Sequence, residues 1–152
     1  MNVSEIEALY LQGIQMLRSG QPAAAAELFR RALAADYYFV EAYNGLGLAL
    51  ATMGRTGPAL HAYDMAIRIA PEFASPHINR GIVLRGLGQL AAALESLDRA
   101  VALQPDNPNA HGNRASILTE LQRPREAIAA FDRALALDPN QNFLRGIRLD
   151  RK

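Results

Sequence analysis

The sequence contains no cysteine among its 152 residues. Disulfide bonds, thiolate nucleophiles and zinc sites built on thiolates are therefore excluded. The chain also lacks an excess of charge of one sign, because 16 Lys and Arg residues stand against 15 Asp and Glu residues and the net charge is +1. Proteins that bind nucleic acid usually carry a strongly basic face, so this balance disfavours a nucleic-acid partner.

Long apolar runs are absent as well. A membrane-spanning helix needs roughly 20 consecutive apolar residues, and here Arg, Asp, Glu or Gln interrupts every helical stretch. The first residues, MNVSEIEALYLQG, contain acids but no Lys or Arg ahead of an apolar run. They lack the positively charged start of a signal peptide. We expect a cytoplasmic protein without membrane insertion.

Small and apolar residues recur with a fixed period of 34 residues, as Pro71, Pro105 and Pro139 do. The same spacing relates Gly47, Gly81 and Ala115; Ala59, Ala93 and Ala127; Tyr63, Leu97 and Phe131; and Ala66, Ala100 and Ala134. One period earlier, the matching places hold Gly13, Ala25, Phe29 and Ala32. A period of this length is typical of a stacked array, in which each unit buries its apolar face against its neighbours.

These columns resemble the tetratricopeptide repeat (TPR) family, whose unit is a helix-turn-helix of the same length with small residues where the helices cross. The resemblance implies an all-α fold, a right-handed superhelical solenoid of four units plus a short C-terminal capping helix. It predicts a single domain, 1–152, with repeats at about 6–39, 40–73, 74–107 and 108–141 and a partial fifth unit or cap at 142–152.

Local signals predict where the helices begin and end. Ser4 and Glu7 fit a capping box that opens a helix from about Glu5 to Arg18. Proline and glycine positions predict further helices at Pro22–Ala35, Val40–Thr52 and Pro58–Ala70, and later helices that open at Ser75–Pro76, Pro108 and Pro124.

Two positions depart from the repeat pattern at its turns. Gln122 replaces the glycine that turns the other units, which is a mild change because glycine is preferred there without being obligatory. Tyr37 replaces the proline that closes the later units, and this predicts an exit turn of different shape in the first unit.

In the TPR family the first helix of each unit lines a concave groove that binds peptides of partner proteins. Matching the columns implies the following groove residues: Tyr10, Ile14, Asn44, Leu48, Ile78, Asn79, Ile82, Arg85, Asn109, Asn113, Ser116 and Glu120. Four glycines fall on or near the same face, where a missing side chain would widen it: Gly45, Gly86, Gly112 and Gly146.

Asn79 and Asn113 share one column of the implied groove. A carboxamide both donates and accepts, so it can pair with the backbone of an extended peptide whatever its side chains are. The pair is similar to the asparagine ladder in the repeat arm of O-GlcNAc transferases, although Leu11 and Gly45 occupy the first two rungs. The other interpretation is two solvated asparagines on an open face.

Two known chemistries find no support in the residues. The TPR clamp for a C-terminal carboxylate needs Lys, Asn and Arg at places that here hold Tyr10, Ile14, Gly45, Ser75 and Asn79, so a chaperone tail is an unfavourable ligand. His77 and His111 share a column with Leu9 and Tyr43, which indicates packing between helices more than a metal site. No catalytic residue, metal ligand or cofactor is predicted.

The sequence therefore favours a non-enzymatic TPR scaffold or adaptor that holds an extended segment of a partner protein. Two alternatives stay open. The tail PNQNFLRGIRLDRK is similar to the junction between repeats and catalytic domain in bacterial O-GlcNAc-transferase-like proteins, which would make the chain the recognition arm of a larger enzyme. Alternatively, the apolar ends, with Leu11 and Leu17 or Phe143 and Leu149, would support weak self-association.

Overall fold

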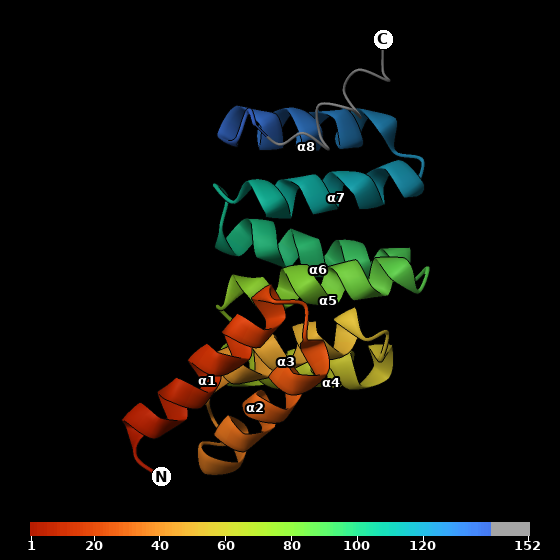
Figure 1. The fold of residues 1–152 in the computed structure, drawn as a ribbon. Coiled ribbons are helices and arrows are strands. Elements are labelled where there is room, and N and C mark those ends of the chain that lie inside the picture. Colours follow the sequence, from red (N-terminus) through yellow and green to blue (C-terminus); the bar gives the residue numbers. More distant parts are fainter. Residues whose placement is uncertain (141–152) are drawn as a thin grey trace. The chain divides into compact units, whose positions relative to one another are not determined.

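The computed structural model describes residues 1–140, and all the regular secondary structure in this range is α-helical. Figure 1 labels the helices in chain order. Their bounds are α1 Val3–Arg18, α2 Pro22–Ala35, α3 Val40–Thr52, α4 Thr56–Ile69, α5 Ala74–Gly86, α6 Leu90–Leu103, α7 Pro108–Glu120 and α8 Pro124–Leu137. The predicted all-α helical-repeat class is confirmed.

The bounds of α2 and α3 are those that the sequence predicts, but the start of α1 is not. Asn2, not Ser4, is the N-cap: its side-chain oxygen accepts from the backbone N–H of Glu5 at 2.9 Å. Glu5 reciprocates by accepting from the Asn2 backbone, which completes a capping box two residues earlier than predicted. The earlier cap adds residues to the helix, so α1 begins at Val3.

The turn inside each repeat is built in the same way. Three of these turns place a glycine in the left-handed region, with φ of 74° at Gly20, 76° at Gly54 and 77° at Gly88. In the fourth turn Gln122 adopts φ of 59°. A residue with a Cβ pays a steric cost in this region that glycine avoids. The substitution at Gln122 is thus accommodated without a change of turn, at the expense of backbone strain.

The turns that connect one repeat to the next also agree. The backbone N–H of Phe39 donates to Asp36 O at 3.2 Å, that of Phe73 to Ala70 O at 3.0 Å, and that of Asn107 to Gln104 O at 3.1 Å. The prediction that Tyr37 gives the first exit turn a different shape is therefore wrong. The other turns hold proline at the second of four positions, where its fixed φ is favourable, but the turn does not require it.

The described residues form two compact units: the first is Met1–Pro76, and the second begins at His77, inside α5. In the first unit, α1 packs against α2, α2 against α3, and α3 against α4. Phe29, which is fully buried, lies at the centre of this packing. A Cβ on Gly13 of α1 or on Gly45 of α3 would come within 2.6 Å of its ring. One aromatic ring of α2 therefore occupies the space that glycines leave on two first helices.

The same relation between a small residue and a bulky one holds inside later repeats. A Cβ on Gly47 would collide with the ring of Tyr63, and one on Gly81 with the side chain of Leu97. Tyr63 and Leu97 are 1% and 0% exposed. In the second unit α6 packs against α7 and α7 against α8. The small residues of the repeat are thus what allows its two helices to approach closely.

Among residues 1–140, no helix is long and apolar enough to cross a membrane. The predicted cap at 142–152, with Gly146, lies outside the described residues.

Candidate functional site

Four polar side chains form a line along α7 in the second unit. Asn109, Asn113, Ser116 and Glu120 are spaced by four, three and four residues, which places them on one side of a helix. All four are at least partly exposed. We call the side of a unit that its first helices present to solvent the first-helix face: it is formed by α1 and α3 in the first unit and by α5 and α7 in the second.

A salt bridge shows that α5 and α7 share this face. Nε of Arg85 on α5 donates to Oε2 of Glu120 on α7 at 2.9 Å, although the two residues are 35 positions apart. Their side chains are 38% and 42% exposed. The bond connects the first helices of consecutive repeats directly, across the exposed side of the unit. Two of the predicted groove residues are therefore neighbours in space.

The polar residues of α7 are oriented by their own helix. The side-chain amide of Asn113 donates to Asn109 O at 2.8 Å, and the hydroxyl of Ser116 donates to Gly112 O at 3.2 Å. Each bond runs to the carbonyl four residues earlier. The bond from Asn113 uses one of its two side-chain N–H groups, which leaves the second N–H and the oxygen for a partner. A peptide backbone would therefore meet an amide whose position is already fixed.

The α5 part of the face is more apolar. Ile82 is 44% exposed, whereas Ile78 is only 8% exposed and offers little surface to a ligand. Asn79 lies between these extremes and is half-buried. Asn79 and Asn113 belong to consecutive first helices of the same unit. The two rungs predicted from the sequence are thus both partly accessible.

The first-helix face of the first unit carries apolar side chains. Leu11 on α1 is 61% exposed and Leu48 on α3 is 42% exposed, while Ile14 and Asn44 are half-buried. Tyr10 contributes more to packing, since its ring centroid lies 5.9 Å from that of Phe29 and 5.1 Å from that of Phe39. Burial raises the pKa of Tyr10, and the carboxylate of Glu41 raises it further.

One expectation about the face is corrected by the glycines. Gly45 was predicted to widen a groove, but it is buried and makes room for the ring of Phe29. Gly112 is buried too. Of Gly45, Gly86 and Gly112, only Gly86 is exposed, and open space lies where its Cβ would stand. Gly86 therefore fits the prediction of a glycine that widens the face. Close packing of α3 against α2 therefore explains Gly45, which the sequence analysis had predicted to widen the groove.

The histidines of the repeat column are part of the packing. Leu9, Tyr43, His77 and His111 are 7%, 8%, 8% and 9% exposed, so the column is buried in all four repeats. Nε2 of His111 donates to Pro105 O at 2.7 Å. Within the described residues, no group of three or more His, Cys, Asp and Glu side chains is placed to hold a metal ion.

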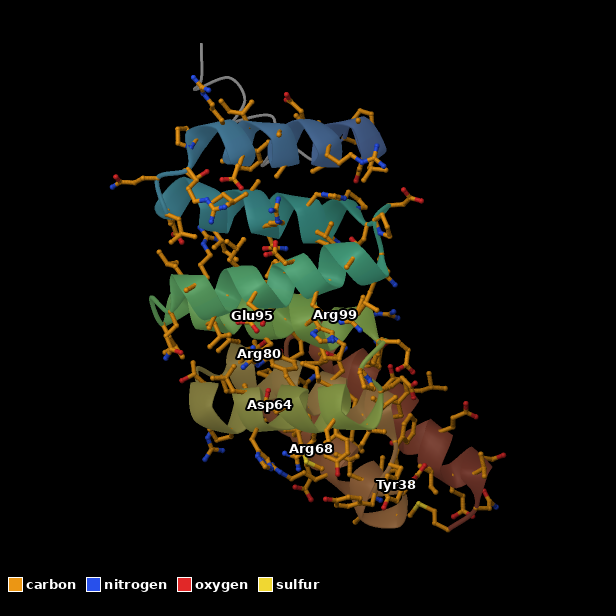
Figure 2. The ribbon with its side chains drawn as sticks, turned by 180° about the vertical axis from the view of Figure 1, so that it is seen from behind. Tyr38, Asp64, Arg68, Arg80, Glu95 and Arg99 are labelled. Carbon is orange, nitrogen blue, oxygen red and sulfur yellow. The ribbon has the colours of Figure 1, made fainter. Side chains whose placement is uncertain are left out.

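The arginines that follow the two asparagines have a role that the sequence did not reveal. Arg80 on α5 donates to Oγ of Ser96 at 2.7 Å, and Arg114 on α7 donates to Oδ1 of Asp98 at 2.6 Å. Both acceptors lie on α6. Figure 2 labels Arg80 beside this helix, where Glu95 and Arg99 stand one turn apart. These two hydrogen bonds connect α5 and α7 to α6, and so help to hold the helices that form the first-helix face of the second unit.

Comparison with known proteins identifies the repeat. The family model described as "Tetratricopeptide repeat" matches residues 10–72 and 78–142. No curated protein matches the chain.

Solved structures share the fold at low sequence identity. MamA from Desulfovibrio magneticus RS-1 has a TM-score of 0.79 and 22% identity over 91% of this chain and 78% of its own. YrrB, described as a TPR protein with an unusual peptide-binding site, has a TM-score of 0.78 and 19% identity over 97% and 76%. The first TPR of Spaghetti (RPAP3), solved with the HSP90 peptide SRMEEVD, has a TM-score of 0.76 and 18% identity over 80% and 97%. These identities establish a shared fold.

Proposed function

Because the chain belongs to the tetratricopeptide repeat family, we propose that it is a protein-interaction scaffold that holds an extended segment of a partner protein on its first-helix face. The observation that carries this proposal is the side-by-side placement of α5 and α7, joined by the bond between Arg85 and Glu120. It brings Asn79 and Asn113 onto neighbouring helices of one exposed face.

The two carboxamides suit an extended backbone. Packed helices lie about 8–10 Å apart, and an extended chain advances roughly 3.3 Å per residue. Successive amides would therefore meet peptide groups about three residues apart. The likeness to YrrB and to the RPAP3 repeat, whose descriptions name a peptide-binding site and a bound peptide, supports a peptide as the ligand.

We also propose that the chain acts by binding and not by catalysis, and that it resides in the cytoplasm. The buried positions of His77 and His111 support the first point, because the hydrogen bond of His111 to Pro105 serves packing. The similarity of the tail to an enzyme junction falls on residues outside the described range and stays a prediction, as do the single-domain organisation and self-association through the ends.

The test removes the carboxamides while keeping the helices. A partner is first captured by crosslinking and mass spectrometry from the source cell, and its binding segment is then synthesised. We expect Asn79→Ala/Asn113→Ala to weaken binding of this segment about fivefold or more, because each lost hydrogen bond costs about 0.5–1.5 kcal/mol. Isothermal titration calorimetry measures the affinity, and far-UV circular dichroism checks that helicity is unchanged.

The matched control is Gln21→Ala/Gln89→Ala, which removes two exposed carboxamides that lie in the turns before α2 and α6, and not on a first helix. This variant should bind like the parent. Equal affinities for the parent and for Asn79→Ala/Asn113→Ala would refute backbone clamping by the two asparagines.

A further inference from the structure

The turn between α2 and α3 exposes two aromatic side chains. Tyr37 and Tyr38 are 58% and 72% exposed. Their rings meet edge to face, with centroids 5.4 Å apart and planes at 85°. Tyr37 also meets the buried Tyr43 edge to face, with centroids 6.1 Å apart. Tyr38 therefore exposes its ring to solvent while it packs on Tyr37, which in turn packs on the buried Tyr43. Figure 2 labels the position of Tyr38.

The fold itself does not require these tyrosines. The turns after α4 and α6 close with the same backbone hydrogen bond but hold Pro71–Glu72 and Pro105–Asp106 at the equivalent places. Proline followed by an acid is thus sufficient for the turn, and it is better hydrated than a pair of phenol rings. Large aromatic side chains left in water without a structural need are typical of contact sites for other molecules.

The aromatic turn itself carries acidic side chains. Between residues 32 and 54 the charged residues are Asp36 and Glu41, and the nearest basic residues in the sequence, Arg30 and Arg31, precede the turn on α2. Asp36 lies in the turn, where its Oδ1 accepts from the backbone N–H of Tyr38 at 3.1 Å. Glu41 is exposed on the first turn of α3, which follows directly. The charges in the turn and directly after it are therefore negative.

We propose that this aromatic turn, residues 36–41, binds an arginine side chain of a partner segment. The guanidinium lies over the exposed face of Tyr38, where the ring quadrupole attracts a cation, and the carboxylates of Asp36 and Glu41 balance its charge. Arginine fits better than lysine because its planar group stacks on an aromatic ring and is weakly hydrated. The site uses the first unit alone and stands independently of the asparagines on α5 and α7.

The test uses two synthetic probes that differ only in charge. One is the blocked peptide acetyl-Gly-Arg-Gly-Arg-Gly-amide, and the other carries citrulline in place of each arginine. Binding to the full chain is followed by NMR of ¹³C-labelled tyrosine rings. We expect saturable shifts at Tyr37 and Tyr38 with the arginine peptide, much weaker shifts with the citrulline peptide, and loss of binding as salt is raised.

The informative variant is Tyr37→Pro/Tyr38→Asp, which copies the residues of the α6–α7 turn and so preserves the backbone. It adds a negative charge while removing both rings. If the rings bind the guanidinium, the affinity falls about two- to fivefold. If the attraction is only charge, the affinity stays equal or rises, and the proposal is wrong.

Two further outcomes would also overturn the proposal. One is equal binding of the citrulline peptide, and the other is the absence of saturable shifts at Tyr37 and Tyr38. Neither outcome bears on the asparagine variants, so failure here is distinguishable from failure of the first-helix face.

Discussion

Replacing Gly47 by alanine tests how tightly the two helices of a repeat are packed. A Cβ at this position would lie 2.6 Å from Cδ1 and 2.9 Å from Cζ of Tyr63, well inside van der Waals contact. The ring is 1% exposed and is enclosed by the core. Overpacking of this kind costs about 1–3 kcal/mol, whereas alanine gains about 1 kcal/mol over glycine in a helix interior. The two effects together predict a net loss of about 0–2 kcal/mol.

Urea unfolding followed by far-UV circular dichroism measures this loss, with two glycines as comparisons. Gly86→Ala, where nothing lies within 4 Å of the new Cβ, should be neutral or stabilise by up to about 1 kcal/mol. Gly81→Ala should cost less than Gly47→Ala, since its closest neighbour is the end of the flexible Leu97 side chain. If Gly47→Ala raises the free energy of unfolding as much as Gly86→Ala does, the helices have room and the reasoning is refuted.

Three other outcomes are expected. Gln122→Gly relieves the left-handed strain and should stabilise the protein by about 0.5–1 kcal/mol in urea unfolding; a loss of stability would contradict it. Burial raises the pKa of Tyr63 above that of an unfolded tyrosine, so the native state keeps a proton that the unfolded state loses above about pH 10, and stability falls by about 1.4 kcal/mol by pH 11. Tyr63→Phe should flatten this alkaline slope, and an unchanged slope would speak against the assignment. A double-mutant cycle on Arg85→Ala and Glu120→Ala should give a coupling of about 0.2–1 kcal/mol that shrinks with salt; zero coupling at low salt would show that the pair is not formed in solution.

The sequence predicts the helices well because their ends are marked by residues with strong local preferences. Pro22 opens α2 and Gly54 turns the second repeat, and neither depends on what lies far away. The start of α1 was missed because Asn2 with Glu5 and Ser4 with Glu7 are equally good capping pairs by local pattern. In the structure Asn2 and Glu5 form the capping box, which gives the longer of the two possible helices.

Features that depend on distant neighbours were harder to predict. Gly45 resembles a glycine on an open face until Phe29 of the preceding helix is placed against it. Similarly, Arg85 and Glu120 were both assigned to the face, but their bond depends on the spacing of α5 and α7. The exit turn at Tyr37 was misjudged because proline is favoured there by its own geometry and not by a requirement of the turn. Which side chains bind a partner stays a prediction.

The ring of Phe29 has a consequence for how such a chain can grow or shrink. Its contacts join two repeats, because Gly13 belongs to the first and Gly45 to the second. The contact inside a repeat recurs with the period, between Gly47 and Tyr63 and between Gly81 and Leu97. The contact between repeats does not recur, because Asn79 and Asn113 stand in the column of Gly45. Copying or deleting a whole period would therefore keep the packing inside each repeat but change what the second-helix side chain meets on the next first helix.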